Sequence, residues 1–109
     1  MNNYNTILKY FKYFSNKDLK SLSEIFDENI TFTDWQIAAI GKEQVLECNL
    51  QVFSSVDKLK VDIIEIIQKD LTFVCQLIIT VNSKEKLEVI DFIKFDQNGK
   101  IISVKAYKG

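Results

Sequence analysis

The chain has 109 residues, of which 14 are basic and 15 acidic, and it contains no histidine, no proline and two cysteines. This length predicts one domain over residues 1–109, and the net charge of −1 argues against a nucleic-acid-binding surface. The missing histidine excludes Ser-His-Asp and Cys-His nucleophiles and histidine-bearing metal sites, so we expect no metal and no other cofactor. Any chemistry must then come from carboxylates, tyrosines, lysines, a thiol or the backbone.

Helical patterns occupy the first half of the chain. An apolar face with spacings of three and four residues predicts a first helix through Tyr4, Ile7, Leu8, Phe11 and Phe14. A capping box at Ser15–Asp18 predicts that a second helix begins there, and the polar triplet Asp27–Asn29 ends it. A β-branched and aromatic strand is expected over Ile30–Trp35, and Gly41 precedes a third helix.

The second half changes to a period of two, which is typical of strands. Turn-forming residues separate the four expected strands, which are Lys60–Lys69, Leu71–Val81, Lys86–Phe95 and Lys100–Tyr107. Because the joints are short, neighbouring strands should pair as antiparallel hairpins. The predicted class is therefore α+β, with helices first and then an antiparallel sheet on which they pack.

Two aspartates occupy strand positions whose neighbours are apolar. Asp91 lies in the middle of the odd-numbered apolar set from Leu87 to Phe95, and Asp34 ends the even-numbered set that begins at Ile30. Since side chains alternate along a strand, both carboxyls should point the same way as their apolar neighbours. Burial of this kind raises a carboxyl pKa and prepares a base or a neutral acid donor. The alternatives are a turn cap facing water for Asp34 and a satisfied core carboxyl for Asp91.

Further polar groups fall on the same interior. Tyr10 lies on the flank of the first apolar helix face, where its ring can be buried while its hydroxyl reaches a partner. Asn49 interrupts the apolar face of the third helix, where a structural hydrogen bond is the alternative role. Cys75 is interpreted as inert core, and so is Cys48, which has no adjacent base.

Three segments together are typical of one known fold family: Val89–Lys100 (VIDFIKFDQNGK) with Ala106-Tyr107, Tyr10 on the first helix, and Phe26–Asn29 followed by the strand to Asp34. On these residues the chain resembles the nuclear transport factor 2-like superfamily, in its ketosteroid isomerase and SnoaL-like branch. It implies a cone-shaped α+β barrel in which three N-terminal helices pack on a curved, mostly antiparallel sheet. It also implies that Asp34 is a proton-shuttling base and that Asp91 and Tyr10 form an oxyanion hole. Phe26 and Asn49 stand where some relatives carry tyrosines.

The resemblance and the inward aspartates together favour proton transfer α to a carbonyl on a small apolar substrate. The catalytic residues would be Asp34, Asp91 and Tyr10. The predicted substrate-binding residues are Phe14, Phe26, Phe32, Trp35, Asn49, Phe53 and Phe73. The alternatives are a non-catalytic module that binds a small hydrophobic ligand, or a dimerisation module of the same fold.

A second apolar sheet face predicts the assembly. The face is expected to consist of Ile64, Ile66, Val74, Ile78, Ile90, Phe92, Ile102 and Val104. Three helices cannot cover both faces of a long sheet, so we expect a homodimer through this outer face. The sequence shows no signal peptide and no apolar run of roughly 20 residues, so we expect a cytoplasmic protein that binds neither membrane nor nucleic acid.

Overall fold

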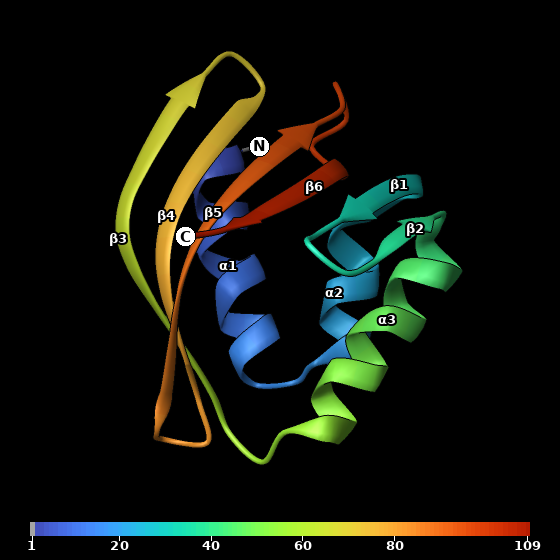
Figure 1. The fold of residues 1–109 in the computed structure, drawn as a ribbon. Coiled ribbons are helices and arrows are strands. Elements are labelled where there is room, and N and C mark those ends of the chain that lie inside the picture. Colours follow the sequence, from blue (N-terminus) through green and yellow to red (C-terminus); the bar gives the residue numbers. More distant parts are fainter. Residues whose placement is uncertain (1) are drawn as a thin grey trace.

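The computed structural model describes residues 2–109 as three helices on one side of a curved six-stranded sheet (Figure 1). The helices are α1 (Asn3–Ser15), α2 (Leu19–Ile25) and α3 (Lys42–Ser55). The strands are β1 (Phe26–Thr33), β2 (Ala38–Ile40), β3 (Leu59–Lys69), β4 (Thr72–Val81), β5 (Glu85–Phe95) and β6 (Ile101–Lys108). The sheet order is β2-β1-β6-β5-β4-β3, and the sheet is not closed. The predicted α+β class is confirmed.

The start of α2 corrects the predicted capping box. Ser15 is still helical and its hydroxyl donates to the Lys12 carbonyl oxygen at 3.1 Å, so it ends α1. Lys17 then adopts a positive φ of 57°, which reverses the chain. The N-cap of α2 is Asp18, whose Oδ1 accepts a hydrogen bond from the Ser21 N–H at 3.1 Å. The sequence pattern placed the start three residues early because Ser15 and Asp18 are both good caps.

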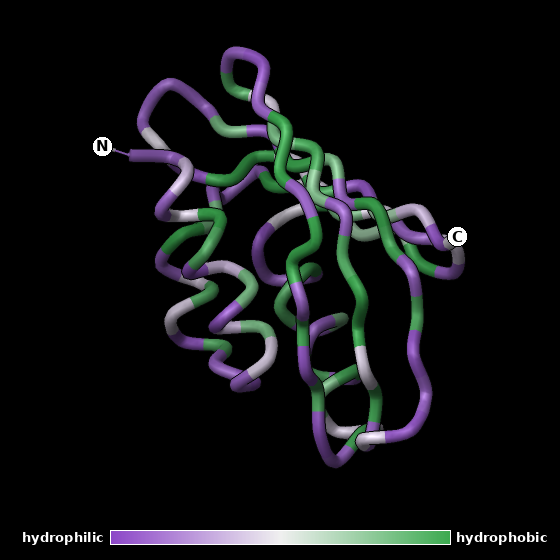
Figure 2. The backbone as a smooth tube through the Cα atoms, turned by 90° about the vertical axis from the view of Figure 1, so that its left-hand side faces the viewer, coloured by the Kyte–Doolittle hydropathy of each residue, from purple (hydrophilic) through white to green (hydrophobic). Residues whose placement is uncertain are grey.

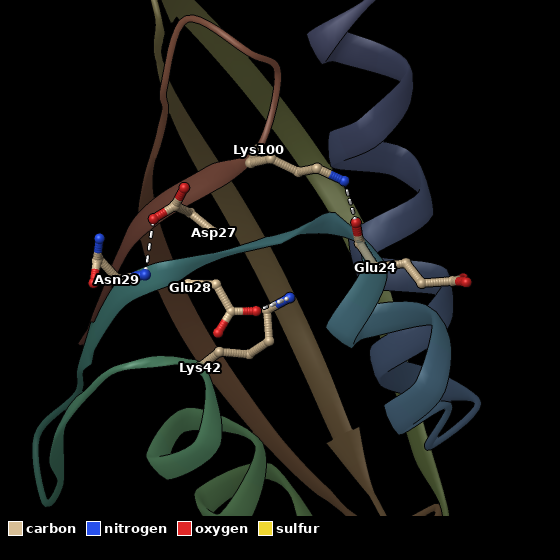
Figure 3. A network of polar contacts seen from close by, with 6 residues as sticks. All are labelled: Glu24, Asp27, Glu28, Asn29, Lys42 and Lys100. Carbon is tan, nitrogen blue, oxygen red and sulfur yellow. Dashed lines mark hydrogen bonds and ion pairs between the residues drawn. The ribbon is translucent and has the colours of Figure 1, made fainter.

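Strand β1 begins earlier than predicted, because the triplet Asp27–Asn29 does not end the preceding helix but forms part of the strand. The pairing of β1 with β6 is parallel, and its register shifts between Phe26 and Thr31. A polar network fixes this irregular stretch (Figure 3): Lys42 Nζ lies 3.2 Å from a Glu28 carboxylate oxygen, and the Asn29 N–H donates to Asp27 at 2.8 Å. Neither the parallel pairing nor the three-residue strand β2 was predicted.

The long strands form antiparallel hairpins as predicted, and Asp91 on β5 pairs with Cys75 on β4 and with Ala106 on β6. Register shifts interrupt the ladder between Ile63 and Glu65 on β3 and beside the Lys94/Phe95 pairings of β5 with β6. Such bulges bend and twist a strand, which is consistent with the curvature of β3 to β5 around the helices (Figure 1).

The bulges also correct the predicted outer face. Ile66 pairs with Cys75 and Val104 pairs with Ile93, and both partners are fully buried, so these two residues lie on the inner face. A single inserted residue exchanges the faces of every position beyond it. Other apolar side chains remain exposed on the molecule's surface: Ile64, Ile67, Phe92, Ile102 and Tyr107. Hydrophobic and hydrophilic positions alternate along the long strands (Figure 2).

The core fills the space between the helices and the concave face of the sheet. Ile7 from α1, Leu22 from α2 and Val45 from α3 are almost completely buried there. Gly41 is the N-cap of α3 and has a φ of 92°, a backbone conformation that favours glycine. Within residues 2–109 no helix has the length and apolar character needed to cross a membrane.

Candidate functional site

A cavity of about 210 Å³ opens between α1, α3, the β1–β2 turn and the concave face of the sheet. Its wall is mostly apolar, with Phe11 and Phe14 from α1 and Val52 from α3 facing strand residues such as Leu77 and Val89. The predicted catalytic residues Tyr10, Asp34 and Asp91 all line this cavity. The structure therefore brings together three residues that are up to 81 positions apart in the sequence.

Asp34 lies in the turn that follows β1, and the turn fixes its carboxylate. Its Oδ1 accepts hydrogen bonds from the Gln36 and Ile37 N–H groups, each at 2.7 Å. The Asp34 N–H in turn donates to the Ile37 carbonyl oxygen at 2.9 Å. The turn-capping role and the cavity-facing role, which the sequence posed as alternatives, are thus combined in one residue, with Oδ2 making no hydrogen bond to residues 2–109.

Asp91 lies deeper in the cavity and is only 6% exposed. Burial, followed by the negative charge of Asp34, raises the pKa of Asp91 from its usual value of 3.8 to about 7. At neutral pH a large share of Asp91 is therefore the uncharged acid, which can donate a hydrogen bond. The inward direction predicted for this side chain is confirmed.

Tyr10 complements Asp91 from α1, where it is 5% exposed. Burial, the charge of Asp91 and then Cys75 raise the pKa of Tyr10 well above its usual value, so the phenol keeps its proton at all physiological pH values. The ring packs against Phe11 and Phe26 at centroid distances of 5.0 and 6.1 Å. These contacts hold the ring while the hydroxyl stays available as a donor.

The polar groups of Tyr10, Asp91 and Asn49 make no hydrogen bond within residues 2–109. Every side-chain nitrogen or oxygen that is fully enclosed in that part of the chain has a partner. The atoms of these three groups are therefore accessible, and the space that they face is the cavity they line. Asn49 itself is 7% exposed. A ligand in the cavity could therefore form hydrogen bonds with one carboxyl, one phenol and one amide, none of which is already bonded to another group within residues 2–109.

Four of the seven predicted substrate-binding residues line the cavity. Phe14, Phe32, Trp35 and Asn49 line the cavity, whereas Phe26, Phe53 and Phe73 are not among its lining residues. These three are buried in the core behind the wall, where Phe53 packs on Phe14 at 5.3 Å and Phe73 on Phe95 at 5.5 Å between ring centroids. Periodicity indicates the face on which a side chain lies but not its depth, and these three residues support the wall rather than form it.

Sequence reasoning missed lining residues on the β1–β2 turn and on α3. Gln36 and Ile37 line the cavity beside Asp34, and Cys48 lines it beside Asn49. Trp35 is 44% exposed at this edge, and the ammonium of Lys108 lies 5.9 Å from its ring centroid. Cys75 lies behind the cavity, and burial, then the charge of Asp91, raises its pKa to about 12, in line with the predicted inert thiol.

The chemistry of the lining is that of acids and hydrogen-bond donors. Among residues 2–109, no group of three or more cysteine, aspartate or glutamate side chains is placed to hold a metal ion. The cavity is instead lined by a fixed carboxylate, a protonated phenol and a carboxyl with a pKa near neutrality. Such a set can accept a proton at one point and stabilise negative charge at another.

Comparison with known proteins identifies a matching family and several solved structures with this fold. The family model of the SnoaL-like domain matches residues 7–104. No curated protein matches the sequence. A proposed SnoaL-like polyketide cyclase from Jannaschia sp. is 16% identical with a TM-score of 0.85, over 97% of this chain and 84% of that one.

Two further solved structures share the architecture. A proposed ketosteroid isomerase from Kribbella flavida is 14% identical with a TM-score of 0.82, over 94% of this chain and 74% of that one. An epoxide hydrolase from Mycobacterium tuberculosis, of the LEH-like type, is 11% identical with a TM-score of 0.83, over 96% and 80%. At these identities the likeness shows the fold alone. The three neighbours that share this fold are named after three different activities.

Proposed function

The chain belongs to the SnoaL-like domain family, and from that premise we propose that its cavity catalyses proton transfer at a carbon α to a carbonyl group. One observation carries the proposal: a fixed carboxylate, a buried phenol and a carboxyl with a pKa of about 7 face the same small apolar cavity. This is the functional set needed to form and hold an enolate.

Asp34 is the base in this proposal. Its Oδ1 is held by two backbone N–H groups, so the carboxylate keeps one orientation while Oδ2 takes the proton from the α-carbon. The C–H bond breaks, its electron pair forms the enolate, and negative charge moves to the carbonyl oxygen. The proton is then returned at the same carbon or at a conjugated one, which restores Asp34. General base catalysis of this kind supplies roughly 10²–10⁴-fold in rate.

Tyr10 and the neutral form of Asp91 donate hydrogen bonds to the enolate oxygen. Both groups face the cavity without an internal partner, and burial keeps the phenol protonated. One donor of this kind contributes about 10²–10³ in rate in a site that excludes water. Ketosteroid isomerase provides the known precedent for dividing two carboxyls into a base and a neutral acid.

The size of the cavity supports a small substrate. A volume of about 210 Å³ is below the range of roughly 300–1,000 Å³ that is usual for pockets of drug-sized ligands. The proposed substrate is therefore a compound with one or two rings, or a short chain, and not a four-ring steroid. Its body is apolar, because most of the lining is aliphatic or aromatic.

The test measures proton abstraction directly. The parent protein is incubated in D₂O with a cyclic β,γ-enone, and deuterium incorporation at the α-carbon and formation of the conjugated enone are followed by NMR. Asp34→Asn retains an acceptor for the Gln36 and Ile37 N–H groups but removes the base, so it should lose at least about 10²-fold in exchange rate. The exposed Asp62→Asn serves as the matched control, and it should exchange like the parent.

Two results would contradict the proposed proton transfer. Absence of exchange with cyclic and acyclic enones, together with measurable binding of the same compounds, would select a module that holds an apolar ligand without converting it. Exchange that Asp34→Asn leaves unchanged would remove Asp34 from the mechanism. A Δ5-3-ketosteroid is included as a size control, and we expect slower turnover of it than of the small enone.

We also propose that the active form is a homodimer in the cytoplasm. Phe92 and Tyr107 pack edge to face at 6.0 Å between ring centroids and remain 39% and 55% exposed, and Ile67 is 56% exposed. An exposed apolar group of this size favours contact with a second copy. The free thiols Cys48 and Cys75 are compatible with a reducing compartment. A monomer in sedimentation at micromolar concentration would contradict the dimer.

A further inference from the structure

Asn49 occupies a position on α3 at which the helix pattern predicts an apolar side chain. Val45, Asn49 and Phe53 follow one another at intervals of four residues on the buried face of α3, and all three are less than 8% exposed. A leucine or valine at the central position would continue the apolar stripe. The amide therefore introduces four hydrogen-bonding valences into a wall that is otherwise suited to aliphatic groups.

The fold itself does not use this amide. Asn49 makes no side-chain hydrogen bond within residues 2–109, although the sequence pattern allowed a structural bond as its role. Its accessible atoms face the cavity, and its α3 neighbours on that wall, Cys48 and Val52, offer no strong partner. An amide that faces the cavity and makes no hydrogen bond within the fold adds nothing to the apolar packing of α3, so this side chain fits a role toward a ligand better than a role in stability.

The amide reaches the cavity from a third element. Tyr10 belongs to α1 and Asp91 to β5, whereas Asn49 belongs to α3. A ligand that fills the cavity and places one oxygen at Tyr10 and Asp91 leaves its remaining surface to the apolar wall and to Asn49. An amide offers both a donor and an acceptor, which suits a hydroxyl, a carbonyl or an amide group but rejects a methyl group at the same place.

We propose that Asn49 determines substrate specificity by binding a second polar group of the substrate. The substrate class is then a small, mostly apolar carbonyl compound that carries a hydroxyl, carbonyl or amide group in addition to the reacting carbonyl. This inference rests on the proposed function, because Tyr10 and Asp91 must bind the carbonyl oxygen of the substrate for Asn49 to bind its second polar group.

The experiment uses phenols, whose oxygen resembles an enolate oxygen in position and charge. Para-ethylphenol and para-hydroxybenzyl alcohol differ by a methyl group against a hydroxyl group, and the meta isomers form a second pair with another spacing. Dissociation constants are measured by calorimetry for the parent protein, for Asn49→Leu and for Val52→Ala. Val52 lines the same wall without a polar group, so its variant controls for a change in cavity shape.

The informative quantity is the ratio of the two dissociation constants within one pair. For at least one pair we expect Asn49→Leu to weaken the preference for the hydroxylated phenol about five- to tenfold, which is the usual contribution of one neutral hydrogen bond. Val52→Ala should leave the ratio unchanged. Equal ratios in the parent and in Asn49→Leu, for both pairs, would overturn the inference while leaving the deuterium exchange test of Asp34 untouched.

A second measurement separates recognition from structure. If Asn49 acts on ligands only, Asn49→Leu should melt at or above the temperature of the parent, because leucine completes the apolar stripe. If Asn49 held the fold through a hydrogen bond, its loss would lower the melting temperature by roughly 4–8 °C, and the inference would be overturned. Failure of every phenol to bind the parent would overturn this inference and the proposed oxyanion site together.

Discussion

The Asp91→Asn substitution separates the cost of burying a carboxylate from the packing of the side chain that carries it. Asparagine has nearly the shape of a neutral aspartic acid, so the variant should resemble the parent at low pH. At higher pH the parent has to ionise a group that is only 6% exposed and lies near Asp34, whereas the variant does not. We therefore predict that Asp91→Asn stabilises the protein, and that the gain grows with pH.

The magnitude follows from the two pKa values of Asp91. The pKa is about 7 in the folded protein and 3.8 in a free side chain, and this difference corresponds to about 4 kcal/mol. Below pH 3.8 the carboxyl is neutral in both states and no difference arises. Between pH 3.8 and pH 7 the unfolded chain ionises and the folded chain does not, so the unfolded state is favoured increasingly as the pH rises. Between pH 5 and pH 8 the parent should lose about 3 kcal/mol relative to the variant.

The assay is urea denaturation of the parent, of Asp91→Asn and of Asp62→Asn at several pH values from 4 to 9. Other carboxyls titrate in the same range, so the quantity compared is the difference in the free energy of unfolding between parent and variant. The exposed Asp62→Asn should follow the parent at every pH. A difference between the parent and Asp91→Asn that does not change between pH 5 and pH 8 would show that Asp91 is charged at neutrality, and it would remove the neutral acid from the proposed mechanism.

Four further predictions concern activity, assembly and reactivity. If the proposed function holds, kcat/KM for enone isomerisation falls as the pH rises through about 7, because Asp91 loses the proton it donates, and Asp91→Asn shows a lower rate without that decline. Tyr10→Phe should reduce kcat about 10²–10³-fold in the same assay, and a loss of less than threefold would exclude the phenol as a donor. Phe92→Lys should shift the proposed dimer toward monomer in analytical ultracentrifugation, while the exposed Lys20→Ala serves as a control away from the sheet. A thiol reagent should modify cavity-lining Cys48 well before Cys75, whose pKa is about 12, and Cys48→Ala should abolish the fast phase of labelling.

Strand periodicity was sufficient to place the carboxyl of Asp91 on the inner face. Asp91 faces inward because the alternation from Val89 to Phe95 is uninterrupted, and buried and exposed side chains alternate along this part of β5 in the same way. The same rule failed for Ile66 and Val104, where bulges in β3 and between β5 and β6 reverse the parity. A bulge is a property of pairing between two strands, and a single strand pattern does not contain it.

Local sequence patterns also could not predict how deeply a side chain is buried, or which distant strands pair with each other. Phe26, Phe53 and Phe73 have the spacing of cavity residues but lie behind the wall, because a face of a helix or strand has residues at several depths. The parallel pairing of β1 with β6 joins segments about 70 positions apart, and no local signal marks it. The resemblance to known proteins supplied what the local patterns lacked, namely that Tyr10 and Asp34 would meet Asp91 in one cavity.

The turn that holds Asp34 has a consequence for the thermodynamics of substrate binding. Two backbone N–H groups keep its carboxylate in one rotamer before any ligand arrives, so the freedom of this side chain is given up when the chain folds. In the proposed mechanism a substrate entering the cavity then does not have to order the Asp34 base, and that share of its binding energy remains available to align the reacting C–H bond. Residues Gln36 and Ile37 contribute to this through their peptide groups alone, so their side chains can vary to suit different substrates while the base stays in place.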